Sequence, residues 1–74
     1  MTAKKQYEWV VINHKKEVVD VWGHAPNEEN GEGDWQRGVG YEVGFVRGSE
    51  KSAYERACET AKDIAKQWGY KTLF

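Results

Sequence analysis

The sequence predicts an α+β domain: a three- or four-stranded antiparallel sheet, in the order β-β-β-α with a short C-terminal strand as the optional fourth, carrying one amphipathic helix on one face. Two patterns lead to this fold class. Three early segments are rich in alternating apolar residues, and one later segment repeats its apolar residues with a helical period. The chain has 74 residues, which is the size of one small domain, so we expect residues 1–74 to fold as a unit.

The first two predicted strands cover residues 6–13 and 17–22. Both are rich in aromatic and β-branched residues, which suit a pleated surface. A polar turn at residues 13–16 separates them, so we expect an antiparallel hairpin. The alternation places Tyr7, Trp9, Val11 and Trp22 on one face and Val10, Ile12, Val19 and Val21 on the other.

A long loop rich in glycine and acidic residues is predicted at residues 23–38. Loops longer than about 12 residues in a compact domain are usually functional or disordered. The run 27–34 lacks the ligand spacing of an EF-hand, so we expect no metal there. The residues that single this loop out as a candidate binding element are Glu28, Glu29, Glu32, Asp34 and Trp35.

The third predicted strand covers residues 39–47 and is strictly alternating. Its glycines fall on one face and leave that face nearly flat. The bulky face carries Val39, Tyr41, Val43 and Phe45, and the flat face carries Glu42 and Val46.

The helix is predicted to begin after Ser52, which forms a capping box with Glu55, while Ser49 is a competing N-cap. Gly69 is expected to end it, and residues 70–74 resume an extended pattern. One apolar stripe consists of Tyr54, Ala57, Cys58, Ala61, Ile64, Ala65 and Trp68.

The volumes of these residues suggest which sheet face the helix covers. The helical stripe is mostly alanine and cysteine, so we expect large sheet side chains, including Trp9 and Trp22, to fill the space beneath it. The opposite face would then be flat, aliphatic and uncovered, unless the loop or the C-terminal tail folds over it. The residues of this predicted uncovered face are Val10, Ile12, Val19, Val21 and Val46.

Composition and motifs exclude several classes. There are 11 basic and 12 acidic residues, so the net charge of −1 provides no bulk attraction to nucleic acid or anionic membranes. Cys58 is the only cysteine and cannot form an internal disulfide, and no apolar leader or membrane segment is visible, which predicts a cytoplasmic protein. His14 and His24 have no serine or cysteine close in sequence. We therefore expect no enzyme activity, no catalytic residues, and no metal or cofactor.

Three strands followed by an alanine-rich helix that opens at residues 48–52 resemble the second half of a double-stranded RNA-binding domain. The chain lacks that family's preceding helix and its cluster of lysines at the start of the last helix. Only Lys51 and Arg56 lie there, beside Glu50 and Glu55. The resemblance therefore implies a version that contacts protein instead of RNA.

The sequence thus predicts a small non-enzymatic protein-interaction module that binds stoichiometrically through the flat sheet face, the acidic loop, or both. The expected partner is another protein or a second copy of the chain, and no small molecule is implied. Small accessory proteins, including phage-encoded inhibitors, have this general character. The alternative is a nucleic-acid-binding domain that uses the sheet aromatics with Lys15, Lys16 and Arg47.

Overall fold

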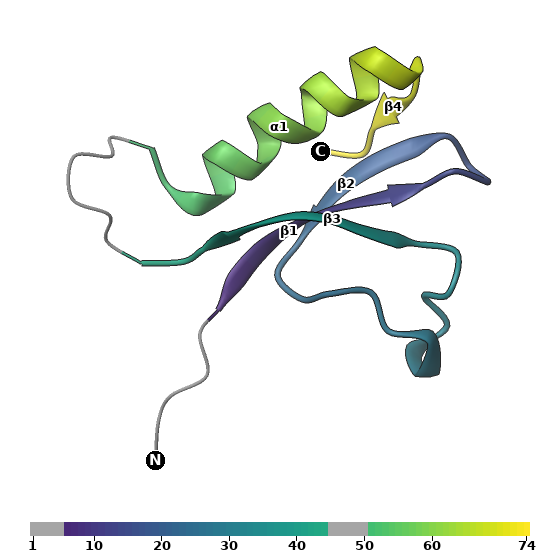
Figure 1. The fold of residues 1–74 in the computed structure, drawn as a ribbon, viewed down its shortest axis with the longest axis horizontal. Helices are drawn as coiled ribbons and strands as arrows, with labels where there is room; N and C mark the ends of the chain where they lie inside the picture. The colour runs from purple at the N-terminus through teal and green to yellow at the C-terminus, as the bar shows by residue number, and fades with distance from the viewer. Residues whose placement is uncertain (1–5, 45–50) are drawn as a thin grey trace.

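The computed structural model describes residues 6–44 and 51–74, which form an α+β fold with one helix against a four-stranded sheet (Figure 1). A single-turn 3-10 helix lies in the loop between the second and third strands. The elements in chain order are β1 (Tyr7–Asn13), β2 (Val18–Trp22), η1 (Glu28–Asn30), β3 (Gln36–Glu42), α1 (Ala53–Trp68) and β4 (Lys71–Thr72).

The sheet has the strand order β3-β1-β2-β4 and is mixed. The hairpin of β1 and β2 is antiparallel as predicted, and β3 is antiparallel to β1 on its other side. A purely antiparallel sheet was wrong for the fourth strand, because β4 runs parallel to β2. Gly69 ends α1 in a left-handed conformation, with φ 72°. Gly31 ends η1 in the same way, with φ 78°. After Gly69 the chain runs beside β2, where Leu73 N–H donates to the Val19 carbonyl over 3.1 Å.

β3 begins three residues earlier than predicted and contains a bulge. Trp9 is paired with Gly40 and Val11 with Arg37, so β1 advances two residues while β3 advances three. The bulge breaks the strict alternation on which the sequence prediction relied. Beyond the bulge the register is regular, and Tyr41 pairs with Glu8 of β1. Tyr41 therefore lies on the helix side, where its hydroxyl is hydrogen-bonded to Thr60. β3 also ends at Glu42, so Val43 and Gly44 are not part of the strand that was predicted to include them. The rest of the predicted strand, residues 45–47, lies outside the described residues.

α1 covers the sheet face that was predicted to be open. Ala57, Ala61 and Ala65 are buried against Val10, Ile12 and Val19, and Val21 packs at the margin of this core. The predicted orientation is therefore wrong, and the reason is the thinness of the layer. Alanines let the helix backbone approach closely, and the space that remains fits branched aliphatic side chains but not indole rings.

The ends of the helix match the prediction. Ser52 is the N-cap and its hydroxyl accepts a hydrogen bond from Glu55 N–H over 3.2 Å. At the other end His14 joins the hairpin turn to the last turn of α1, because its ring contacts the rings of Trp68 and Tyr70. The Tyr70 hydroxyl is hydrogen-bonded to His14 Nδ1 over 2.8 Å.

Among the described residues, α1 is not long and apolar enough to cross a membrane.

Candidate interaction surface

The sheet face opposite α1 carries three of the four tryptophans of the chain. Trp9 and Trp22 are direct cross-strand partners on β1 and β2, so their side chains share this face. Tyr7 lies two residues before Trp9 and follows the same alternation. Trp35 reaches the face from the loop before β3. We call Tyr7, Trp9, Trp22, Trp35 and Arg37 the aromatic face.

The rings of the aromatic face form two groups. In the first, the Trp9 ring lies 5.3 Å from the Tyr7 ring, and the Arg37 guanidinium lies 5.2 Å from the centre of the Trp9 ring. Gly40 makes this position possible, because a Cβ on Gly40 would lie 2.4 Å from the Trp9 ring. The absence of a side chain at Gly40 therefore leaves the space that the Trp9 ring occupies.

The second group joins the sheet to the acidic loop. Trp22 lies 4.6 Å from Trp35 and is stacked with His24 at 5.2 Å, centre to centre. The Trp22 indole N–H donates to an Asp20 carboxylate oxygen over 3.0 Å, which satisfies its polar atom on a face that is only partly covered. The loop is thus anchored to the sheet by aromatic contacts.

Hydrogen bonds give the loop a defined shape. Asn27 caps η1 by accepting from Glu29 N–H over 2.9 Å. Glu32 accepts from Asn27 N–H through one carboxylate oxygen, and its other oxygen is 3.0 Å from His24 Nε2. The hydrogen bond from His24 lowers the pKa of Glu32. Desolvation raises this pKa by less, and the hydrogen bond from Asn27 lowers it by a smaller amount again, so the net shift is downward. Figure 1 shows the loop on the side of the sheet away from α1.

The loop presents most of its carboxylates to solvent. Glu28 and Glu29 are exposed on η1, and Asp34 is exposed and 3.5 Å from the Lys15 ammonium. Glu42 is in register with Tyr7 of the aromatic face, and Asp20 is in register with Val11, which lies between the strands of that face and is fully buried. Among residues 6–44, these carboxylates outnumber the two cations that contact this face or its loop, Arg37 and Lys15.

The residues predicted to bind a partner divide into three sets. Of the loop residues, Trp35 is half-buried and packs on Trp22, and Glu32 is hydrogen-bonded to His24, which stacks on Trp22. Glu28, Glu29 and Asp34 are exposed. The predicted flat face is core instead: Val10 and Val19 are fully buried, Ile12 is buried, and Val21 is half-buried under α1. Val46 lies outside the described residues.

The residues of the nucleic-acid alternative are less concentrated. Lys15 and Lys16 are exposed in the hairpin turn, but Lys15 is paired with Asp34. Arg47 lies outside the described residues. The aromatic side chains that this alternative needs are only partly in place, since Tyr41 has turned to the helix side.

Sequence reasoning assigned Tyr7, Trp9 and Trp22 to the core and did not select Arg37 or His24. One signal pointed to the correct arrangement. Gly40 interrupts a strand of larger residues, and a glycine inside a strand often marks the close approach of another group. Here that group is the Trp9 ring.

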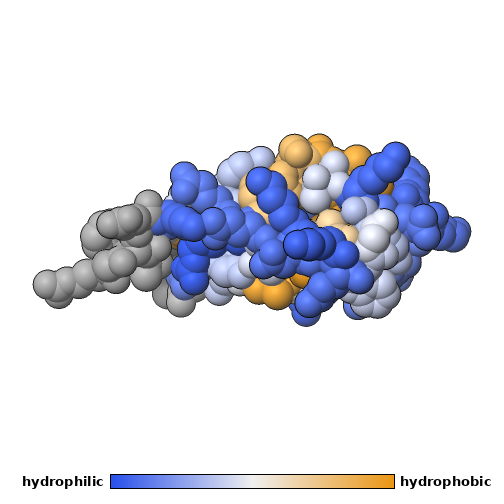
Figure 2. Space-filling model, turned by 90° about the horizontal axis from the view of Figure 1, so that it is seen from above, coloured by the Kyte–Doolittle hydropathy of each residue, from blue (hydrophilic) through white to orange (hydrophobic). Residues whose placement is uncertain are grey.

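The remaining surface offers weaker candidates. Seen from the α1 side, most of the visible surface is hydrophilic, with hydrophobic atoms in smaller areas (Figure 2). Within the described parts of the chain, no three histidine, cysteine or carboxylate side chains come together in a way that could hold a metal ion.

Comparisons with protein-family models, with curated proteins and with solved structures found no match to this chain.

Proposed function

We propose that this protein is a small non-enzymatic interaction module that binds a protein partner stoichiometrically through the aromatic face and the adjoining acidic loop. The observation that carries the proposal is the gathering of three tryptophans on the sheet face that the helix does not cover. Each ring is half-buried and so keeps part of its surface open to solvent. Tryptophan, tyrosine and arginine are the residues most enriched among interface hot spots.

The charge around this face selects the chemistry of the partner. Glu28, Glu29 and Asp34 are exposed carboxylates of the loop that Trp35 joins to Trp22. Among the described residues, Lys15 is paired with Asp34 of this loop, and Arg37 lies on the Trp9 ring. A segment bearing lysine or arginine would gain ion pairs with the loop and cation–π contacts with the indoles. A second copy of the chain would bring carboxylates against carboxylates. The proposed partner is therefore a different protein with a basic segment.

The proposal places this module in the cytoplasm, in keeping with one unpaired, half-buried thiol at Cys58. An inhibitor or accessory role fits such a module, because it would act by occupying a surface and not by chemistry. Nucleic acid is the competing ligand, since exposed rings can stack bases. The local excess of carboxylates opposes it, because phosphate binding depends on clustered cations.

The test is affinity capture from a native lysate with the tagged protein, with and without nuclease, followed by mass spectrometry. The wild type is expected to retain a protein with a basic segment at equimolar ratio, and retention is expected to survive nuclease. The paired charge reversals Glu28→Lys and Glu29→Lys, and separately Trp35→Ala, are expected to abolish retention. The control Asp63→Lys changes an exposed carboxylate on α1 and is expected to keep it.

Two results would overturn the proposal. Retention that disappears with nuclease would assign the face to nucleic acid. Retention that is lost equally in Asp63→Lys and in the loop variants would show that overall charge, and not this face, is responsible. Light scattering on the purified protein adds a third check, because a concentration-dependent dimer that Trp35→Ala dissociates would identify a second copy as the occupant.

A further inference from the structure

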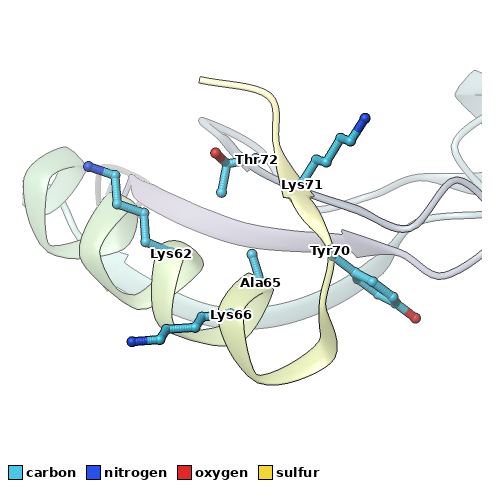
Figure 3. Close-up of a pocket in the computed structure, with 6 residues that line it drawn as sticks. All are labelled: Lys62, Ala65, Lys66, Tyr70, Lys71 and Thr72. Carbon is cyan, nitrogen blue, oxygen red and sulfur yellow. The ribbon is translucent and has the colours of Figure 1, made fainter.

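A hollow lies between the C-terminal half of α1 and β4, away from the aromatic face (Figure 3). Its volume is about 520 Å³, and it is a shallow depression that is broadly open to solvent. The backbone on the β4 side is fixed, because Lys71 N–H donates to the Glu17 carbonyl and Leu73 N–H to the Val19 carbonyl, each over 3.1 Å. The hollow is lined by Lys62, Ala65, Lys66, Tyr70, Lys71 and Thr72.

Small side chains create this space. Ala65 is buried and presents only a methyl group from the helix, while Thr72 is half-buried on the facing strand. Figure 3 shows Ala65 and Thr72 between the lysines, with Lys62 and Lys66 on the helix side of the hollow and Lys71 on the strand side. The hollow therefore has an uncharged floor, the Thr72 hydroxyl and lysines along its edges, while the Tyr70 hydroxyl is hydrogen-bonded to His14.

The three lysines of the rim have no carboxylate partner among the described residues, whereas Lys15 is paired with Asp34 and Lys51 with Glu59. Lys62 and Lys66 are one helical turn apart, a spacing at which like charges destabilise a helix. Lys66 lies in the last turn, where a cation favourably opposes the helix macrodipole. That explanation does not extend to Lys62 or Lys71, which form no ion pair among the described residues.

We propose that this hollow binds a small anion that carries phosphate groups. The ammonium group of lysine is a compact point charge that suits phosphate, while carboxylates are better matched by the planar fork of arginine. In Figure 3 the ammonium groups of Lys62 and Lys66 extend outward on one side of the hollow, and that of Lys71 extends outward on the other. Their long, flexible side chains would turn inward to an anion seated above Ala65, and the Thr72 hydroxyl would donate to it. The anion would replace mutual repulsion among the lysines with attraction. The site is separate from the aromatic face and does not depend on the function proposed for that face.

The test is a titration of the ¹⁵N-labelled full chain with inorganic pyrophosphate at low ionic strength, followed by two-dimensional NMR. Saturable shifts are expected at the amides of Ala65, Lys71 and Thr72. The double variant Lys62→Gln with Lys71→Gln is expected to bind about tenfold more weakly, which is the usual effect of losing charge-assisted hydrogen bonds. The control Lys15→Gln with Lys51→Gln removes the same charge elsewhere and is expected to bind as the wild type does.

Three results would overturn the inference. Small, non-saturating shifts spread over the molecule would show general ionic screening. Equal weakening in the control variant would show a response to net charge alone. Citrate binding at the same amides with the affinity of pyrophosphate would remove the assignment to phosphate. Without anion, Lys62→Gln is expected to melt no lower than the wild type, since it relieves repulsion; a lower melting temperature would give Lys62 a structural role instead.

Discussion

At the residue scale, Gly40 is the position on which the arrangement of the aromatic face most depends. Its missing side chain is the space occupied by the Trp9 ring, and the Arg37 guanidinium stacks on that ring. A side chain added at Gly40 would meet the Trp9 ring and not backbone atoms. Because the ring can move, we expect a substitution at Gly40 to disturb the aromatic face more than the overall fold.

We expect Gly40→Ala to displace the Trp9 ring and to lower the free energy of unfolding by about 1–3 kcal/mol, the usual cost of overpacking. Urea denaturation measures the loss, and the NMR shift of the Trp9 indole N–H reports the displacement. Gly23→Ala is the matched control, because a Cβ there meets no atom within 4 Å. Equal stability of the Gly40 variant and the wild type, with an unmoved Trp9 signal, would contradict the packing described for β3.

Glu32 provides a second prediction at this scale, which concerns pH. Its pKa is lowered in the folded loop, mainly by the hydrogen bond with His24. A carboxylate with a lowered folded-state pKa stabilises the fold at pH above its unfolded pKa, and this contribution is lost as the pH falls through the folded pKa. We therefore expect acidification to loosen the loop below the usual glutamate range.

The Asn27 amide reports this titration, because it donates to Glu32. Its NMR shift is expected to titrate with a midpoint below the ordinary pKa of glutamate. Glu32→Gln should remove the transition, and Glu29→Gln, which alters an exposed neighbour, should leave it in place. A midpoint at the ordinary glutamate value would mean that the hydrogen bond with His24 does not hold the carboxylate in solution.

At the element scale, the sequence predicted β1, β2, α1 and the short β4 close to their observed bounds, because alternation, helical period and caps are local signals. It could not predict the bulge in β3 or the parallel pairing of β4, since both depend on which strands become neighbours. The orientation of the sheet was also wrong. Both faces of the sheet are apolar, so hydrophobicity alone does not predict which face the helix covers. The small alanines of α1 pack against the face with the smaller, aliphatic side chains.

This corrected orientation leads to a sharp prediction for Val19. We expect Val19→Lys to cost about 3 kcal/mol or more, because it places an unpaired charge in the core between β2 and α1. In a domain of this size such a loss leaves the chain largely unfolded at 37 °C, which circular dichroism would detect. Val43→Lys is the matched control, since Val43 is 44% exposed, and it should fold normally. If the Val19→Lys variant folds normally, the sheet face that carries Val19 is not buried beneath α1 as described.

At the scale of the whole molecule, charge and aromatic surface are separated. Carboxylates collect around the aromatic face, while unpaired lysines collect at the hollow between α1 and β4. The acidic loop could be selected from the sequence because its charge and length are local properties. Alternation also placed Trp9 and Trp22 on one face, but the contact of Trp35 with Trp22 depends on how the loop folds back onto the sheet. The lysine rim depends on the turn after Gly69, which brings Lys71 beside the end of α1.

This separation predicts how binding of the proposed partner responds to mutation. We expect Glu28→Gln with Glu29→Gln to lower the association rate severalfold and to weaken its dependence on salt, with the dissociation rate unchanged. Trp35→Ala should instead raise the dissociation rate, by about tenfold or more for a hot-spot residue. Surface plasmon resonance at two ionic strengths measures both rates. The reverse pattern would mean that the loop charges, and not the rings, form the buried centre of the complex.

The distribution of tryptophans also gives the protein its own optical label. Trp9, Trp22 and Trp35 occupy one face, and Trp68 is the exception, at the end of α1 beside His14. Most of the intrinsic fluorescence therefore originates from the surface that we expect to be occupied. Occupation should shift the emission maximum to shorter wavelength and protect it from acrylamide quenching, while the contribution of Trp68 remains as an internal reference. The protein can thus be screened against candidate partners unmodified, with no attached dye to disturb the loop.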